Sequence, residues 1–205
     1  MPMPDAYLFD IGNVIITFDF RISARNLARD AAVSAEEILA LVSPLTIALE
    51  LGHLSPADFI AEASARIGYR GTPEQFHALF ADIFELNEPM AAFLTSLQSE
   101  GFPLYLLSNT NAIHAPFFEA RYPIFGIFDG RIYSHEIGLM KPDPAIYERA
   151  KSDLSLDPAR TVYIDDIAAN CAAGEAAGFL SVPYDATRHG DFLDALARIE
   201  TTMRP

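Results

Sequence analysis

The sequence predicts an α/β fold in which helices cover both faces of a parallel sheet. Four short apolar runs, rich in β-branched and aromatic residues, are typical of buried strands: AYLFDIG (6–12), PLYLLSN (103–109), TVYIDD (161–166) and FLSVPY (179–184). Each of the last three runs follows a helical pattern after a short link, and this alternation is typical of βαβ units. The expected core is therefore a doubly wound, Rossmann-like parallel sheet.

The helical patterns stand directly before these strands. They cover NEPMAAFLTSLQSEG (87–101), DPAIYERAKSDL (143–154) and AANCAAGEAAG (168–178). The first and third end in glycine, which is favoured just past a helix C-terminus because it adopts left-handed backbone angles without strain. One further stretch, IFDGRIYS (127–134), predicts a hairpin-like edge to the sheet around Asp129 and Gly130.

Between the first and second strands the pattern is helical and contains no strand run. Capping boxes begin at Ser34 (SAEE) and Thr72 (TPEQ), and SPAD at Ser55 resembles one with proline at the first helical position. The sequence therefore predicts an α/β core formed by residues 1–17 and 87–205, with a small inserted helical-bundle cap formed by residues 18–86.

Composition and charge limit the classes of partner. The chain has 205 residues, of which 51% are hydrophobic and 20% charged, values typical of a soluble globular protein. The net charge of −14 disfavours nucleic acid and anionic membranes as partners. The single cysteine, Cys171, excludes an internal disulfide, and no run approaches the roughly 18 apolar residues of a membrane span. We expect a cytoplasmic protein that is a monomer or a homodimer.

Polar side chains stand where the predicted strands end. They are Asp10 after the first, Ser108 and Asn109 after the second, Asp165 and Asp166 after the third, and Lys141 just before a helix. Because the carboxyl ends of parallel strands share one edge of the sheet, these residues are expected to converge. Converging carboxylates repel one another, and a hard divalent cation such as Mg²⁺ relieves that repulsion. With the positive charges of the cation and of Lys141 offsetting the carboxylates, this set of residues can bind an anionic phosphate ester.

The order of FDIGNV, LLSNT, MKPDPAIY and YIDDIAAN along the chain resembles the four motifs of the haloacid dehalogenase (HAD) superfamily, in its helical-cap branch. The similarity spans nearly the whole chain and is greatest to the sugar-phosphatase-like members and to the N-terminal phosphatase domain of soluble epoxide hydrolase. The resemblance implies a Mg²⁺-dependent phosphatase. Its substrate would be a small soluble phosphate monoester, a sugar phosphate being one candidate.

The resemblance also implies roles for residues around the phosphate. Asp10 would be the nucleophile that attacks phosphorus and forms an aspartyl-phosphate, which water then hydrolyses. Ser108 and the backbone of Asn109 would bind the phosphoryl group. Lys141 would neutralise charge on both the nucleophile and the phosphate.

The metal site follows from the same resemblance. Asp10 and Asp166 would bind Mg²⁺ together with the backbone carbonyl of Gly12. Asp165 would be a further ligand or would orient a metal-bound water, and Asn170 would lie behind these ligands.

The sequence departs from the family pattern at Gly12. Most phosphatases of the superfamily carry there a second aspartate, which protonates the leaving oxygen, and loss of such an acid typically costs about 10²- to 10⁴-fold in rate. One solution is a preference for substrates with good leaving groups, such as sugar 1-phosphates, acyl phosphates or aryl phosphates. The other is an acid from the insert. His53 is the candidate, because ELGHLSPADF (50–59) resembles the loop between cap helices that faces the active site in related proteins. The other histidines considered are expected at the surface or as helix caps: His114, His135 and His189.

Two alternative functions stay open. The first is a 2-haloacid dehalogenase, because those enzymes also lack the second aspartate; they need no metal, whereas Asp165 with Asp166 is a metal-type pair. The second is a catalytically weak protein that binds a phosphate metabolite and has lost turnover together with the acid.

Overall fold

A parallel sheet forms the centre of the molecule in the computed structural model, which describes residues 4–202. Its strand order is β5-β4-β1-β6-β7, with every neighbouring pair parallel. The strands are β1 (Ala6–Phe9), β4 (Leu104–Ser108), β5 (Gly130–Tyr133), β6 (Thr161–Asp165) and β7 (Leu180–Pro183). The predicted α/β fold with a parallel sheet is therefore confirmed.

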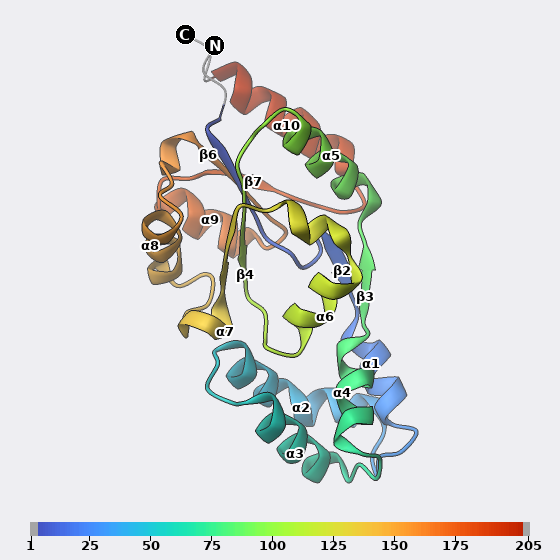
Figure 1. Cartoon of the computed structure of the whole chain (residues 1–205). Coiled ribbons are helices and arrows are strands. Elements are labelled where there is room, and N and C mark those ends of the chain that lie inside the picture. The colour runs from blue at the N-terminus through green and yellow to red at the C-terminus, as the bar shows by residue number, and fades with distance from the viewer. Residues whose placement is uncertain (1–3, 203–205) are drawn as a thin grey trace.

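Helices cover both faces of this sheet (Figure 1). The chain forms α5 (Glu88–Ser99), α6 (His114–Arg121), α7 (Ser134–Ile137), α8 (Pro144–Asp153), α9 (Ala168–Ala176) and α10 (His189–Thr202), with 3₁₀ turns η1 (Pro123–Ile127) and η2 (Pro158–Arg160). Successive side chains of β1 pack on opposite faces of the sheet. Tyr7 and Phe9 belong to the apolar cluster that includes residues of α5 and α10, whereas Leu8 belongs to the cluster that includes residues of α8. None of the described helices is long and apolar enough to cross a membrane.

The strand β5 corrects one expectation. It pairs with β4 in parallel, with Tyr105 opposite Gly130, so the predicted hairpin-like edge is wrong. The reason lies in the connection: α6 and η1 carry the chain back to the start of β4 before β5 begins, and such a crossover produces a parallel pair. The Asp129 carboxylate fixes this return by accepting a hydrogen bond from the Leu104 N–H at 2.9 Å.

Four helices lie together at one end of the core (Figure 1): α1 (Phe20–Leu27), α2 (Ala35–Glu50), α3 (Pro56–Ile67) and α4 (Pro73–Ala81). We call them the cap helices. Ser34 and Thr72 each form the predicted capping box, and the Ser55 hydroxyl accepts from the Asp58 N–H at 3.1 Å. The cap helices pack around an apolar cluster that contains Phe59, Phe76 and Phe80 and also includes Ile113 of the core.

Two short strands connect the cap helices to the core. β2 (Ile16–Phe18) and β3 (Phe84–Leu86) form an antiparallel pair in which Ile16 lies opposite Leu86. The sequence did not predict them, because three residues give too short a run for periodicity to be recognised. The division into a core (1–17 and 87–205) and a cap (18–86) stays a prediction. Most of the cap helices pack in one apolar cluster and the central strands in others, but Ile83 and Phe84 belong to the cluster of the core and Ile113 to that of the cap helices.

Candidate active site

The carboxyl ends of the three central strands open into a cavity of about 210 Å³, which we call the Asp10 cavity. Its lining comes from both the core and the cap helices: Asp10, Gly12, Asn13, Phe18, Glu50, Asn109, Lys141, Asp166, Ile167 and Asn170. A neighbouring cavity of about 60 Å³, which we call the Ser108 cavity, shares Gly12, Phe18, Glu50 and Asn109 with it and adds Ser108. The predicted site residues other than His53 and Asp165 thus line one of two adjoining cavities.

Lys141 joins two of the predicted acids. Its Nζ lies 2.7 Å from Asp10 Oδ1 and 2.6 Å from Asp165 Oδ2, and its side chain is 1% exposed. Burial alone would lower the pKa of Lys141, but the two carboxylates raise it above its ordinary value. Burial raises the pKa of Asp10 to about 6, against the attraction of Lys141. The site therefore holds two buried carboxyl groups around one ammonium ion.

Asn109 fixes the backbone of this lysine. Its amide Nδ2 donates to the Lys141 carbonyl at 2.9 Å, and its Oδ1 accepts from the Lys141 N–H at 2.8 Å. These two hydrogen bonds join the end of β4 to the loop that carries Lys141. The backbone of Lys141 is therefore held in place although it lies outside any helix or strand. The phosphoryl contacts expected of Ser108 and Asn109 stay predictions.

Asp165 is fully buried and surrounded by donors. Besides Lys141, its carboxylate accepts from Tyr163 Oη at 2.6 Å, the Ile167 N–H at 2.8 Å and Asn170 Nδ2 at 3.0 Å. This number of partners nearly exhausts the capacity of a carboxylate. With these donors already bound, Asp165 is better suited to orienting Lys141 than to binding a metal ion. The role of Asp165 as a metal ligand stays a prediction.

Asp166 is half-buried, and its Oδ2 accepts a hydrogen bond from Asn13 Nδ2 at 3.0 Å. Asn13 has φ of 54°, a left-handed conformation that asparagine adopts more readily than most residues. The motifs predict no role for Asn13, although its position directly after a glycine in FDIGNV is an available signal of such a turn. Burial raises the pKa of Asp166 above its ordinary value.

The donor set fits a hard divalent cation. Asp10, Asp165 and Asp166 each offer a carboxylate oxygen, and these oxygens lie within 4.8 Å of one another. Oxygen donors of this kind suit Mg²⁺, which also keeps positions for water and phosphate oxygens. The carbonyl of Gly12 belongs to a residue that lines the same cavity.

The position of the missing aspartate is sterically closed. A Cβ on Gly12 would lie 2.8 Å from Cε1 of Phe18, so any side chain there would displace the ring. His53 is exposed on the turn between α2 and α3 and is not among the residues that line the Asp10 cavity, so its predicted role gains no support from this geometry. Glu50, the last residue of α2, lines the cavity instead, since it stays on the helix while the chain turns away after it.

His114 corrects a second expectation, since it is buried rather than exposed or capping. Its ring stacks on Phe80 of α4 with centroids 4.6 Å apart, and burial lowers its pKa to about 4. Nε2 faces the Phe80 carbonyl at 3.1 Å, which only accepts, so the proton resides on Nε2. A neutral imidazole on α6 therefore binds α4 to the core beside the Ser108 cavity.

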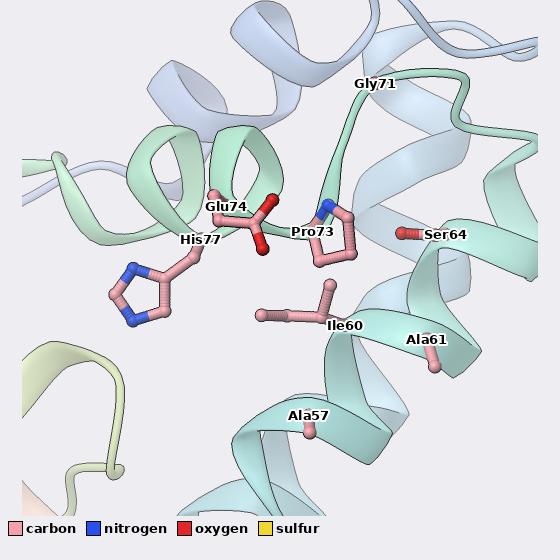
Figure 2. Close-up of a pocket in the computed structure, with 8 residues that line it drawn as sticks. All are labelled: Ala57, Ile60, Ala61, Ser64, Gly71, Pro73, Glu74 and His77. Atoms are coloured by element: carbon pink, nitrogen blue, oxygen red, sulfur yellow. The ribbon is translucent and has the colours of Figure 1, made fainter.

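A cavity of about 570 Å³ lies elsewhere, between α3 and α4 (Figure 2). Ile60 of α3 and Pro73 of α4 face one another across it, and Glu74 and His77 are its ionisable lining residues. It shares no lining residue with the Asp10 cavity. It also lacks the acid–lysine combination of the central strands, and we assign no chemistry to it.

The fold and the site together define a class of α/β proteins with a parallel sheet and a buried aspartate–lysine pair at the carboxyl ends of the central strands. Residues 4–178 match the family model of haloacid dehalogenase-like hydrolases, and the chain belongs to this family. The family resemblance inferred from the motifs is therefore confirmed, and the protein is a hydrolase.

Relatives with assigned activities cover most of the chain. It is 28% identical to the sesquiterpene phosphatase astK of Aspergillus oryzae, over 86% of this chain and 88% of that protein. It is 27% identical to the D-ribitol-5-phosphate phosphatase of Bacteroides thetaiotaomicron, over 84% and 87%. The crystal structure of a HAD family enzyme from Bacteroides thetaiotaomicron, in complex with magnesium and inorganic phosphate, superposes with a TM-score of 0.80 at 26% identity, covering 89% of this chain and 95% of that one.

Proposed function

We propose that the protein is a Mg²⁺-dependent phosphatase that hydrolyses a small phosphate monoester through an aspartyl-phosphate at Asp10. The observation that carries the proposal is the buried Asp10 carboxyl group, which lies 2.7 Å from the Lys141 ammonium and lines a cavity that also contains Asp166. The two relatives named above as phosphatases and the neighbour that binds magnesium and phosphate support it.

The chain's own residues account for the transfer. An Asp10 carboxylate oxygen attacks phosphorus in line with the leaving oxygen, so the new O–P bond forms as the ester O–P bond breaks. Lys141 keeps Asp10 ionised and balances the charge that the phosphoryl group brings into a buried site. Asp165 holds the Lys141 ammonium in place through its contact at 2.6 Å. Ser108 and the Asn109 backbone bind the phosphoryl oxygens.

When bound, Mg²⁺ supplies charge that offsets the repulsion between the carboxylates and the phosphate. Asp10, Asp166 and the Gly12 carbonyl would hold it, with Asp165 as the remaining candidate ligand. The hydrogen bond of 3.0 Å from Asn13 would fix the Asp166 carboxylate for this role. The cap helices exclude water during transfer and contact the leaving alcohol.

A fourth cavity bears on the nature of this alcohol. It has a volume of about 470 Å³, lies between α1 and α2, and shares Phe20 and Glu50 with the Ser108 cavity. We call it the cap cavity. Its other lining residues are mainly apolar: Ser23, Ala24, Leu27, Ile38, Leu39, Val42, Ser43, Thr46, Ile47 and Phe80. Such a lining favours an alcohol with apolar surface over the sugar phosphate considered from the sequence.

A screen of phosphate esters with and without Mg²⁺ tests the proposal. The substrates are p-nitrophenyl phosphate, D-ribitol 5-phosphate and a fifteen-carbon prenyl phosphate. We expect phosphate release from the aryl ester, a larger kcat/KM for the prenyl ester than for the ribitol ester, and a loss of about 10²-fold or more on metal removal with EDTA.

Other outcomes would overturn the proposal in different ways. Chloride release from 2-chloropropionate in EDTA would identify a dehalogenase. Thermal stabilisation by phosphate esters without phosphate release would identify a binding protein. A higher kcat/KM for the ribitol ester than for the prenyl ester would leave the phosphatase function standing. It would refute the inference that the leaving alcohol is apolar.

A further inference from the structure

The phosphatase chemistry lacks one component, a proton donor for the leaving oxygen. Gly12 has no side chain, and the Phe18 ring lies where one would stand. The ionisable residues that line the Asp10 cavity besides Asp10 are Lys141, Asp166 and Glu50. Lys141 is bound to two carboxylates, and Asp166 is assigned to the metal. Glu50 is the remaining acid.

Glu50 occupies the junction of three cavities. It lines the Asp10 cavity, the Ser108 cavity and the cap cavity, and among their described lining residues it is the only one common to all three. The first two contain the groups assigned to the phosphate, whereas the third extends away from them between α1 and α2. A substrate whose phosphate meets Asp10 and whose alcohol enters the cap cavity must bring its ester oxygen past Glu50.

We propose that Glu50 is a catalytic residue of this phosphatase, donating a proton to the leaving oxygen in the first step and recovering one from water in the second. The proposal depends on the phosphatase function proposed above, because it assigns a role within that reaction. It places the general acid on a cap helix rather than beside the nucleophile, so proton donation would require the cap to be closed over the substrate.

The surroundings of Glu50 suit such a role. Within residues 4–202 its carboxyl group has no hydrogen-bond or ion-pair partner, so its proton is not committed elsewhere. The ionisable groups that line the same cavities are Asp10, Lys141, Asp166 and the neutral His114. Burial raises the pKa of Glu50 to about 7, so a substantial fraction carries a proton at neutral pH.

Both steps balance with Glu50 as acid and then base. In the first, Asp10 forms its bond to phosphorus, the electron pair of the broken O–P bond stays on the leaving oxygen, and the Glu50 proton converts that oxygen to the alcohol. In the second, the Glu50 carboxylate accepts a proton from the water that attacks phosphorus. Inorganic phosphate forms, the Asp10 carboxylate is released and protonated Glu50 is restored.

The dependence of rate on the leaving group tests this role with the full-length protein. Glu50→Gln removes the proton but keeps the shape of the side chain. We expect kcat/KM to fall about 10²- to 10⁴-fold for alkyl phosphates, whose leaving oxygens need protonation. For p-nitrophenyl phosphate, whose leaving group is stable as an anion, we expect a loss of less than about tenfold. Glu36→Gln, an exposed position on the same helix, is the matched control.

The retained activity on the aryl ester shows in the same assay that the variant is folded. Equal losses on alkyl and aryl esters, or no loss on either, would overturn the assignment of Glu50 while leaving the phosphatase function standing. An inactive wild-type protein would instead refute the proposed function. The two failures are therefore distinguishable.

Discussion

Asp10→Asn is expected to lower kcat for an aryl phosphate by about 10⁴-fold or more, because a neutral amide cannot form the covalent phosphoryl intermediate. The measurement is steady-state phosphate release with saturating Mg²⁺. The substitution keeps the size of the side chain, and Lys141 retains Asp165 as its partner at 2.6 Å. A variant with near wild-type kcat would contradict the nucleophile assignment.

The stability of this variant provides its control. The folded-state pKa of Asp10 is raised to about 6, so the ionised carboxylate lowers the free energy of unfolding at neutral pH, and this cost disappears as the pH falls and the group is protonated. Asp10→Asn removes the charge altogether. We therefore expect a melting temperature equal to or above that of the wild type, which separates lost chemistry from lost folding.

Lys141→Met is expected to have the largest effect on stability. It leaves Asp10 and Asp165, both buried, without the cation they share, and removing one partner of a buried ion pair typically costs about 3–5 kcal/mol. For a chain of this size the melting temperature should fall by roughly 10 °C at neutral pH, measured by calorimetry. Turnover should be lost as well, since no other cation contacts Asp10 among the described ion pairs.

Two further variants make this measurement specific. Lys151→Met removes a partly exposed lysine paired with Glu148, and we expect a change below about 1 kcal/mol. Adding Asp10→Asn to Lys141→Met removes one of the two uncompensated carboxylates, so the double variant should be more stable than Lys141→Met alone. Unchanged stability in Lys141→Met would show that the three groups do not interact as the distances indicate.

Local sequence signals were sufficient for the elements and for part of the site. Capping boxes at Ser34 and Thr72 mark helix starts because their hydrogen bonds lie within four residues. Apolar runs with a polar end identified the central strands, and the alternation of strands and helices brought Asp10 and Lys141 into one expected site. These predictions depend on interactions between residues close in the sequence and on the general rule that the carboxyl ends of parallel strands lie at the same edge of the sheet.

The remaining features depend on contacts between distant segments. Glu50 is one of several acids in the insert, and only the packing of α2 on the core makes it a lining residue of the Asp10 cavity. His114 gives no local signal of burial, because its partner carbonyl at Phe80 is 34 residues away. The direction of β5 follows from the path of α6 and η1, which a hairpin-like Asp-Gly signal did not reveal.

Trapping the aspartyl-phosphate tests the role of Asp10 as nucleophile. The enzyme is mixed with Mg²⁺ and a ³²P-labelled phosphate ester, quenched in acid within one turnover, reduced with borohydride and mapped by mass spectrometry. We expect an acid-stable, base-labile label and conversion of Asp10 to homoserine, with Asp165 and Asp166 unchanged. Turnover with no covalent label, or with label at another residue, would contradict this role of Asp10.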